Sequence, residues 1–177
     1  MQELESAFSG DRSRFEGATI WLHEASHAAH YLARWPEKIL AVRIEKAELG
    51  YLKAEPVLAD GVEIEDLGCG LLVQYLAGSI GERIGAGERQ IVSGLDLVGT
   101  HWIEHLTNTP FGSDVDRFAA ASVFAHSEID VSTLRAELEL AERLLRHSLP
   151  MIDLEELERV YESLGGVTIE ALTKTYH

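Results

Sequence analysis

His23, Glu24 and His27 lie in the segment HEASH, where their types and spacing could bind a metal ion and move a proton. On a helix, residues four apart share one face with Cβ atoms about 5–6 Å apart, so both imidazoles can reach one tetrahedral ion. Glu24 would lie beside that face, where it can accept a proton from a metal-bound water. This is the HExxH arrangement, in which two histidines hold zinc and the glutamate is the general base.

A catalytic zinc usually has three protein ligands and an open position. His30 lies one turn beyond His27 on the expected helix, too far along to converge on the same ion, so we expect it to be a neighbour of the site. By residue chemistry alone, Glu82, Asp114 and Asp116 are all reasonable third ligands.

A second segment, HWIEH from His101 to His105, matches the reversed HxxEH signature of inverzincins. Residues typical of turns and exposed segments surround it, among them Gly99 and Pro110. We therefore expect a short, exposed helix here and not a second metal site.

The HEASH segment is predicted to lie in a helix over 14–34. Ser13 and Glu16 have the spacing of a capping box, and Pro36 ends the pattern. Apolar residues lie on several sides of this helix, so it is expected to be buried, and two buried histidines need partners. These residues are Ile20, Trp21, Leu22, Ala25, Ala28 and Ala29.

The next segment predicts a small sheet or hairpin. Leu40, Val42 and Ile44 alternate with polar or small residues, and Gly50 precedes a second short run that starts at Tyr51. An extended substrate could pair with this segment as an added strand, and Val42, Ile44, Gly50 and Tyr51 are its expected contact residues.

The remaining segments favour helices. We expect a buried helix over 62–84, a helix between 93 and the turn at NTP, and a helix after Ser113, which has capping-box spacing to Asp116. STLRAELELAERLLRHSL, DLEELERVYESL and TIEALTKTY predict three further helices with polar outer faces. The expected fold class is α+β and mainly helical, with a small sheet or hairpin and a C-terminal helical bundle.

Composition bounds the number of domains and the class of partner. The 177 residues, 46% of them hydrophobic, suffice for one domain over 1–177. The formal net charge of −15 repels phosphate backbones and anionic lipid surfaces, so neither nucleic acid nor membrane is an expected partner. Cys69 is the only cysteine, and the N-terminal segment lacks the apolar core of a signal peptide. We expect a soluble, cytoplasmic protein.

The order of motifs resembles the protease domain of FtsH, a membrane-anchored AAA zinc metalloprotease. That family has HEAGH, a strand with an LGY or LGV turn, a helix with GGRAAEEL, and then GASNDLERAT. This chain has HEASH, ILAVRIEKAELGY, AGSIGERI and GSDVDRFAA in the same order. The helical C-terminal part is also similar, so the resemblance covers most of the chain and implies a zincin-like fold.

The resemblance implies roles for particular residues. His23 and His27 match the first two zinc ligands, and Glu24 matches the catalytic base. Asp114 matches the aspartate of the ND pair and becomes the third ligand. Asp116 falls at an acidic position that is not a ligand in the family, where a helix-capping role suffices.

Glu82 matches the first glutamate of AEEL, for which we expect a supporting role near a zinc-bound histidine. The chain also departs from the family pattern. Ser26 replaces the usual glycine of the motif, which requires that the facing backbone leaves room for a hydroxymethyl group. Between Ile84 and Gly112 the chain is longer than the pattern, and this 85–111 insertion contains HWIEH.

The function that the resemblance implies is a zinc metallo-endopeptidase, with Zn²⁺ as cofactor and flexible or unfolded polypeptides as substrates. No Walker A loop of the form GxxxxGK[ST] occurs in the sequence, so we expect an ATP-independent enzyme, unless a separate ATPase partner feeds it. The resemblance also implies a homo-oligomer. The alternative is a binding or regulatory module with restricted or lost turnover, in which the insertion covers the cleft or recruits a partner.

Overall fold

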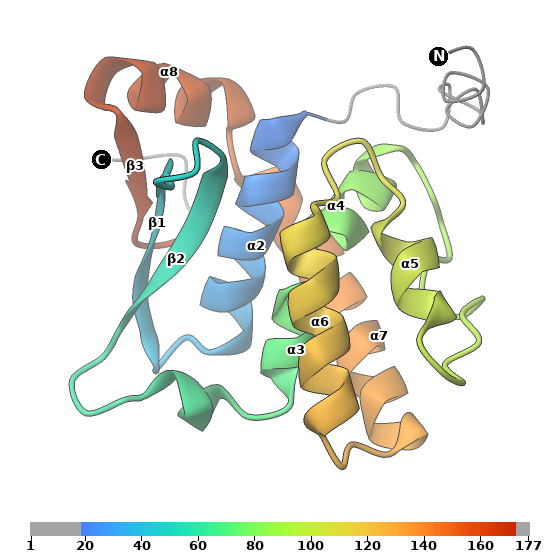
Figure 1. Cartoon of the computed structure of the whole chain (residues 1–177). Helices are drawn as coiled ribbons and strands as arrows, with labels where there is room; N and C mark the ends of the chain where they lie inside the picture. Colours follow the sequence, from blue (N-terminus) through green and yellow to red (C-terminus); the bar gives the residue numbers. More distant parts are fainter. Residues whose placement is uncertain (1–18, 173–177) are drawn as a thin grey trace.

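A computed structural model describes residues 19–172 of the chain. Helix α2 lies at the centre, with a three-stranded sheet on one side and the helices α4 and α7 on the other (Figure 1). In chain order the elements are α2 (Ile20–Arg34), β1 (Ile39–Lys46), β2 (Leu52–Leu58), η2 (Ile64–Leu67), α3 (Gly70–Gln74), α4 (Ala77–Gly85), α5 (His101–Thr107), α6 (Asp114–His126), α7 (Val131–Ser148), η3 (Leu149–Met151), α8 (Leu154–Leu164) and β3 (Gly166–Ile169). The predicted class, α+β and mainly helical with a small sheet, is confirmed.

Helix α2 is buried along most of its length because it is apolar on several sides. The Thr19 hydroxyl caps its first turn by accepting a hydrogen bond from the Leu22 N–H at 3.1 Å. The helix ends at Arg34, and Trp35 is its C-cap, directly before Pro36, which disfavours helical backbone in the preceding residue. The predicted capping box at Ser13 and Glu16 lies outside the described residues.

The sheet is antiparallel with the strand order β2-β1-β3, so β1 is the central strand. Val42 and Ile44 are fully buried, as their alternation predicts. Leu40 was expected on the same face but is 57% exposed, because a register shift between Ile39 and Ala41 reverses the alternation there. The prediction for Leu40 was therefore wrong.

Strand β3 replaces the start of the helix that TIEALTKTY predicts. Gly165 ends α8 in the left-handed conformation, with a φ of 75°, and the chain then pairs with β1. Val167 and Ile169 bury their β-branched side chains in the core. Long-range strand pairing outweighs the helical pattern here, and residues 173–177 lie outside the described part.

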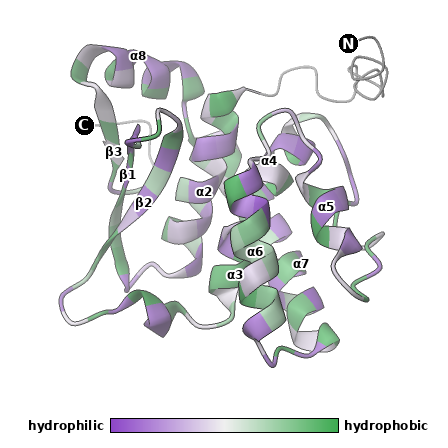
Figure 2. Ribbon diagram, viewed as in Figure 1, coloured by the Kyte–Doolittle hydropathy of each residue, from purple (hydrophilic) through white to green (hydrophobic). Residues whose placement is uncertain are grey.

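The predicted helix over 62–84 is divided into η2, α3 and α4. Gly68, with a φ of 65°, follows η2, and the N–H of Leu76 bonds to the carbonyl of Val73 in a tight turn between α3 and α4. This division gives α4 its own direction, so that it packs closely against α2. Helices α7 and α8 carry both hydrophilic and hydrophobic residues, as amphipathic helices on a core do (Figure 2).

Residues 88–95 of the 85–111 insertion pack against α7, and α5 packs against α4 and α6. Arg146 donates to the carbonyl of Glu88 at 2.6 Å, and Arg135 donates to the carbonyl of Leu95 at 2.9 Å. The helix expected from residue 93 onward forms only at α5, after a run of turns. Within residues 19–172 no helix combines the length and the apolar character needed to cross a membrane.

Candidate metal centre

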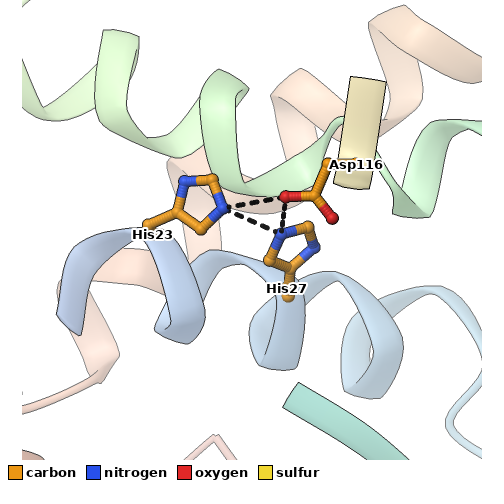
Figure 3. Close-up of side chains that lie close together, drawn as sticks. All are labelled: His23, His27 and Asp116. Atoms are coloured by element: carbon orange, nitrogen blue, oxygen red, sulfur yellow. Dashed lines mark hydrogen bonds and ion pairs between the residues drawn. The ribbon is translucent and has the colours of Figure 1, made fainter. Parts of the chain in front are cut away.

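Three potential ligand atoms converge between α2 and α6 (Figure 3). Nε2 of His23 lies 3.2 Å from Nε2 of His27 and 3.3 Å from Oδ2 of Asp116, and Nε2 of His27 lies 3.6 Å from the same oxygen. A tetrahedral ion with bonds of about 2.0–2.1 Å separates its ligand atoms by about 3.3–3.4 Å. The observed spacing therefore fits one small metal ion.

The second nitrogen of each imidazole has its own partner. Nδ1 of His23 donates to the Glu82 carboxylate at 2.6 Å, and Nδ1 of His27 donates to the backbone carbonyl of Gln74 at 2.9 Å. With Nδ1 protonated in both rings, each Nε2 presents a lone pair to the common point. Two such lone pairs beside a carboxylate repel one another unless a cation lies between them, so the donor set fits a metal ion.

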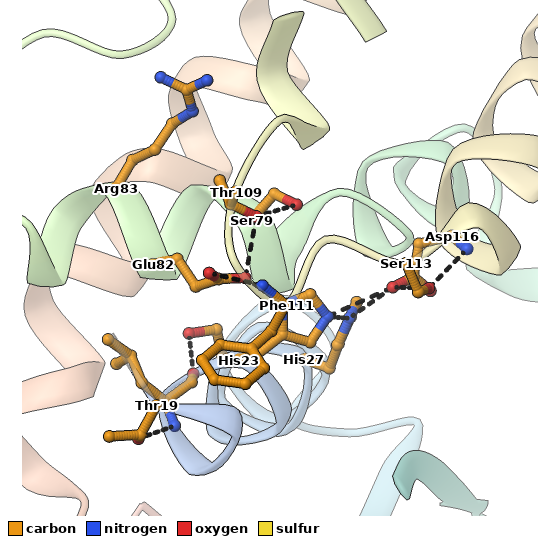
Figure 4. A network of polar contacts seen from close by, with 12 residues as sticks. Thr19, His23, His27, Ser79, Glu82, Arg83, Thr109, Phe111, Ser113 and Asp116 are labelled. Atoms are coloured by element: carbon orange, nitrogen blue, oxygen red, sulfur yellow. Dashed lines mark hydrogen bonds and ion pairs between the residues drawn. The ribbon is translucent and has the colours of Figure 1, made fainter. Parts of the chain in front are cut away.

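Glu82 is held in place from the far side of His23 (Figure 4). It is fully buried, and its carboxylate accepts hydrogen bonds from the Thr109 hydroxyl at 2.9 Å and from the Phe111 N–H at 3.1 Å. The insertion supplies both donors. Glu82 thus contacts a potential ligand, in the supporting position that its match to the family pattern implies.

Asp116, and not Asp114, joins the histidines. Ser113 caps α6 by accepting from the Asp116 N–H at 3.0 Å and donates its hydroxyl to Oδ2 of Asp116 at 2.8 Å. Asp114 lies two residues earlier, about 200° around the helix axis. Its side chain is 74% exposed and forms an ion pair with Arg117. The prediction of Asp114 as third ligand is therefore corrected to Asp116, which residue chemistry alone had also allowed.

Glu24 lines the same cleft as the three ligand atoms and is only 5% exposed. Burial raises the pKa of its carboxyl group, while the neighbouring His27 and His23 and a hydrogen bond from the Ala54 backbone lower it. A carboxylate with a raised pKa is suited to accept a proton and return it later.

The electrostatics of the group favour a bound cation. Burial lowers the pKa of His23, but its contacts with Asp116 and Glu82 outweigh this and raise it to about 9. Burial raises the pKa of Asp116, but hydrogen bonds from His23 and His27 bring it far below its ordinary value. In the absence of metal, the proton on His23 supplies the positive charge that Asp116 and Glu82 stabilise.

The cleft has a volume of about 330 Å³ and is bordered by the segment from Tyr51 to Glu55. The Ala47 N–H bonds to the Tyr51 carbonyl at 2.8 Å, which makes these two residues a hydrogen-bonded pair of the ladder. By alternation, the backbone groups of Leu52, Ala54 and Pro56 point away from β1, toward the open edge of β2. Pro56 has no N–H to offer there.

The predicted substrate-binding strand is only partly in place. Val42 and Ile44 lie in the central strand β1, which β2 and β3 pair on its two sides, so their backbone cannot receive a further strand. That part of the prediction is corrected: β2 and β3 are the two edge strands of the described sheet, and β2 is the one that borders the cleft. Tyr51 lines the cleft, and Gly50 forms the β1–β2 turn with a φ of 89°.

Two glycines of α4 allow its close approach to the histidines and to Ser26. A Cβ atom on Gly78 would lie 2.4 Å from Nε2 of His23 and 2.6 Å from Nε2 of His27. A Cβ atom on Gly81 would lie 1.7 Å from the hydroxyl oxygen of Ser26. Gly81 therefore provides the room that Ser26 requires in place of the usual glycine of the motif.

His30 lies outside the group of ligand atoms. Its Nδ1 donates to the side-chain carbonyl of Gln74 at 2.6 Å, and the Gln74 amide donates to the backbone carbonyl of His27 at 3.1 Å. Burial lowers the pKa of His30 to about 4, so the ring is neutral. Sequence reasoning missed Gln74, because only the packing of α3 against α2 brings it to the histidines.

HWIEH does not form a second metal site. The His101 side chain is 96% exposed and lies 3.8 Å from the Glu104 carboxylate, whereas Trp102 and Ile103 are buried. Within residues 19–172, His23, His27 and Asp116 are the one group of histidine, cysteine and acidic residues whose ligand atoms converge.

Comparison of the chain with protein families, curated proteins and solved structures finds no match. The resemblance to the FtsH protease domain therefore stays a prediction. The structure itself places a buried site that could hold a metal ion beside a buried glutamate, in a cleft bordered by an open strand edge.

Proposed function

We propose that this chain is a zinc-dependent endopeptidase with a zincin-like, FtsH-type peptidase fold that acts without ATP. One observation carries the proposal: the three convergent ligand atoms share a cleft with Glu24, a carboxylate that is not one of them. Two imidazoles and a carboxylate form a donor set that zinc prefers, and three protein ligands leave a position open for water or substrate.

The residues divide the chemistry between them. His23, His27 and Asp116 would hold the metal, and Glu82 orients His23. When bound, zinc lowers the pKa of a bound water towards about 7 and polarises the scissile carbonyl. Glu24 takes the proton of the attacking water and later passes it to the leaving amine, for which its raised pKa is suited.

The substrate binds along the open edge of β2, where the backbone groups of Leu52 and the carbonyl of Ala54 pair with an extended polypeptide, while the Ala54 N–H stays bonded to Glu24. Pro56 ends this ladder on one side because it cannot donate. Main-chain pairing reads little sequence, so the substrates are flexible or unfolded segments. Folded substrates require a separate ATPase that unfolds them, and a homo-oligomer could present several sites to one chain.

The alternative, a module with restricted turnover, has less support. A lid over the cleft would favour it, but of the 85–111 insertion only Phe111 lines the cleft, while Glu88 and Leu95 bond to α7 and α5 packs against α4 and α6. The path from solvent to Glu24 is therefore not closed by the insertion.

The experiment is metal analysis of the purified protein together with cleavage of unfolded casein by the wild type and by Glu24→Gln. We expect about one equivalent of zinc in both proteins and cleavage only by the wild type. Zinc in both proteins with cleavage in neither would favour the regulatory module. Protein that takes up no zinc, or equal cleavage by both proteins, would refute the proposed mechanism.

A further inference from the structure

Most polar side chains that line the cleft already have partners among the described residues. His23, His27 and Asp116 face one another through their convergent ligand atoms. Glu24 is bonded to the Ala54 backbone, and Lys53 to the Glu55 carboxylate. Gln74 donates to the His27 carbonyl, and Ser113 donates to Asp116. Three phenol hydroxyls remain without a hydrogen bond in residues 19–172, those of Tyr31, Tyr51 and Tyr75. They are the side-chain hydroxyls that the cleft can still offer to a ligand, in addition to the backbone groups of β2.

Tyr31 differs from the other two because it belongs to the helix that carries the ligands. His23, His27 and Tyr31 are four residues apart in succession and so share one face of α2. Side chains of a helix lean toward its N-terminus, which directs the phenol of Tyr31 back toward His27. The hydroxyl thereby extends the row of ligand side chains by one turn, along the floor of the same cleft.

The surroundings of Tyr31 suit a hydrogen-bond donor. The residue is 7% exposed, and its ring packs against Trp35 with the ring centroids 6.0 Å apart. Among the described residues, the one side-chain polar atom that is both fully buried and without a hydrogen bond is Nε2 of His30. The Tyr31 hydroxyl has no hydrogen bond either, so it must retain some contact with solvent in the cleft. Burial first, and then the charges of Tyr75, Glu55 and Asp116, raise the pKa of Tyr31, so the phenol keeps its proton.

We infer that the Tyr31 hydroxyl donates a hydrogen bond to the carbonyl oxygen of the scissile peptide and stabilises the negative charge that develops on it. This inference rests on the proposed peptidase function. It supplies the side chain that faces the oxyanion, a role that HExxH itself does not assign. A donor on the rigid helix that also holds the metal keeps its position while charge develops, and a largely buried donor competes with little water.

The test uses the zinc-loaded full chain and a phosphinic pseudodipeptide, in which a tetrahedral phosphinate replaces the amide between Phe and Ala. Its anionic oxygen imitates the oxyanion, so binding is measured by calorimetry without turnover. Tyr31→Phe removes only the hydroxyl and keeps the ring against Trp35. We expect phosphinate affinity to fall by about 10-fold to 100-fold at unchanged zinc affinity and melting temperature. In casein cleavage, kcat should fall by about 100-fold.

Two matched substitutions complete the test. Tyr161→Phe makes the same change on α8, where the ring packs against Trp21 outside the cleft, and should change neither reading. A loss in Tyr75→Phe that equals or exceeds that in Tyr31→Phe would assign the donor to Tyr75 and overturn the inference.

The outcomes separate this inference from the proposed function. Unchanged phosphinate affinity and kcat in Tyr31→Phe, with normal zinc binding and cleavage by the wild type, would overturn the role of Tyr31 alone. Wild-type protein that binds zinc but not the phosphinate would overturn the peptide cleft and this role together. Wild-type protein that binds no zinc would overturn both proposals, because each of them requires a bound zinc ion.

Discussion

Replacing each of the two aspartates at the start of α6 by alanine, in separate variants, tests the geometry of the candidate metal centre most directly. Asp116→Ala removes one of three ligand atoms, whereas Asp114→Ala removes an exposed carboxylate on the opposite side of the same helix turn. The two changes are matched in chemistry and lie two residues apart. Only the rotation of α6 about its axis decides which of them affects the metal.

The size of the effect follows from the coordination. Loss of a residue that merely supports a ligand typically costs about 10-fold to 100-fold in metal affinity, so loss of Asp116 should cost at least about 100-fold. At a free zinc concentration of about 1,000 times the dissociation constant, binding stabilises the fold by about 4.1 kcal/mol, and a 100-fold loss reduces this to about 1.4 kcal/mol. For a chain of this size the difference lowers the melting temperature by about 5–11 °C.

Chelator competition measures the zinc affinity, and thermal unfolding with zinc and with EDTA measures the linked stability. Asp114→Ala should keep the zinc affinity and the zinc-dependent gain in melting temperature, because its ion pair with Arg117 is a surface contact. In EDTA, the difference in melting temperature between the two variants measures the metal-independent cost of losing the contact between Ser113 and Asp116, and this cost is subtracted from the zinc-dependent effect. Zinc binding that is lost in Asp114→Ala and kept in Asp116→Ala would refute the assignment of α6's inner face.

Two further predictions concern the same site. Gly78→Ala should weaken zinc binding by more than about 10-fold, because its Cβ would meet both imidazoles, while Gly94→Ala, with no atom within 4 Å of the added Cβ, should bind zinc normally. Overpacking against two buried imidazoles costs about 1–3 kcal/mol, and the higher helix propensity of alanine offsets about 1 kcal/mol of this, so a modestly lowered melting temperature together with weakened zinc binding in chelator assays is the expected pair of results. The raised pKa of His23 means that the metal-free folded chain binds the proton on this imidazole more tightly than the unfolded chain does. Protonated His23 therefore stabilises the fold fully below pH 6.5, and this stabilisation is lost as the pH rises to about 9. Zinc affinity should rise over the same interval because the proton competes with the metal, and a flat affinity between pH 6.5 and 9 would contradict this coupling.

Local spacing explains what could be predicted from the sequence. The helical repeat alone places His23 and His27 on one face and Glu24 beside it, and Ser113 caps the helix that its spacing to Asp116 predicts. The contribution of α6 depends instead on its rotation against α2, which local spacing does not determine. Matching residue by residue to a family pattern placed the ligand at Asp114, and an offset of two residues exchanges the inner and outer faces of a helix.

The same distinction explains the other differences. The open edge of β2, the register shift near Leu40 and the pairing of β3 with β1 all depend on contacts between segments that are distant in the sequence. Gln74 approaches His27 only because the predicted helix over 62–84 is divided before α4. No periodicity within a single segment carries this information.

The 85–111 insertion gains a role in the site from its last residues. Thr109 and Phe111 supply the two donors that hold Glu82 behind His23. Two residues later, Ser113 holds Asp116 on the other side of the metal position. One short connection between α5 and α6 therefore positions a supporting carboxylate and a ligand together. The rest of the insertion anchors that connection by packing on the core, with the apolar residues of α5 buried and its histidines exposed. A segment that contains HWIEH can therefore position residues of the candidate metal site, although the ligand atoms of that motif do not converge.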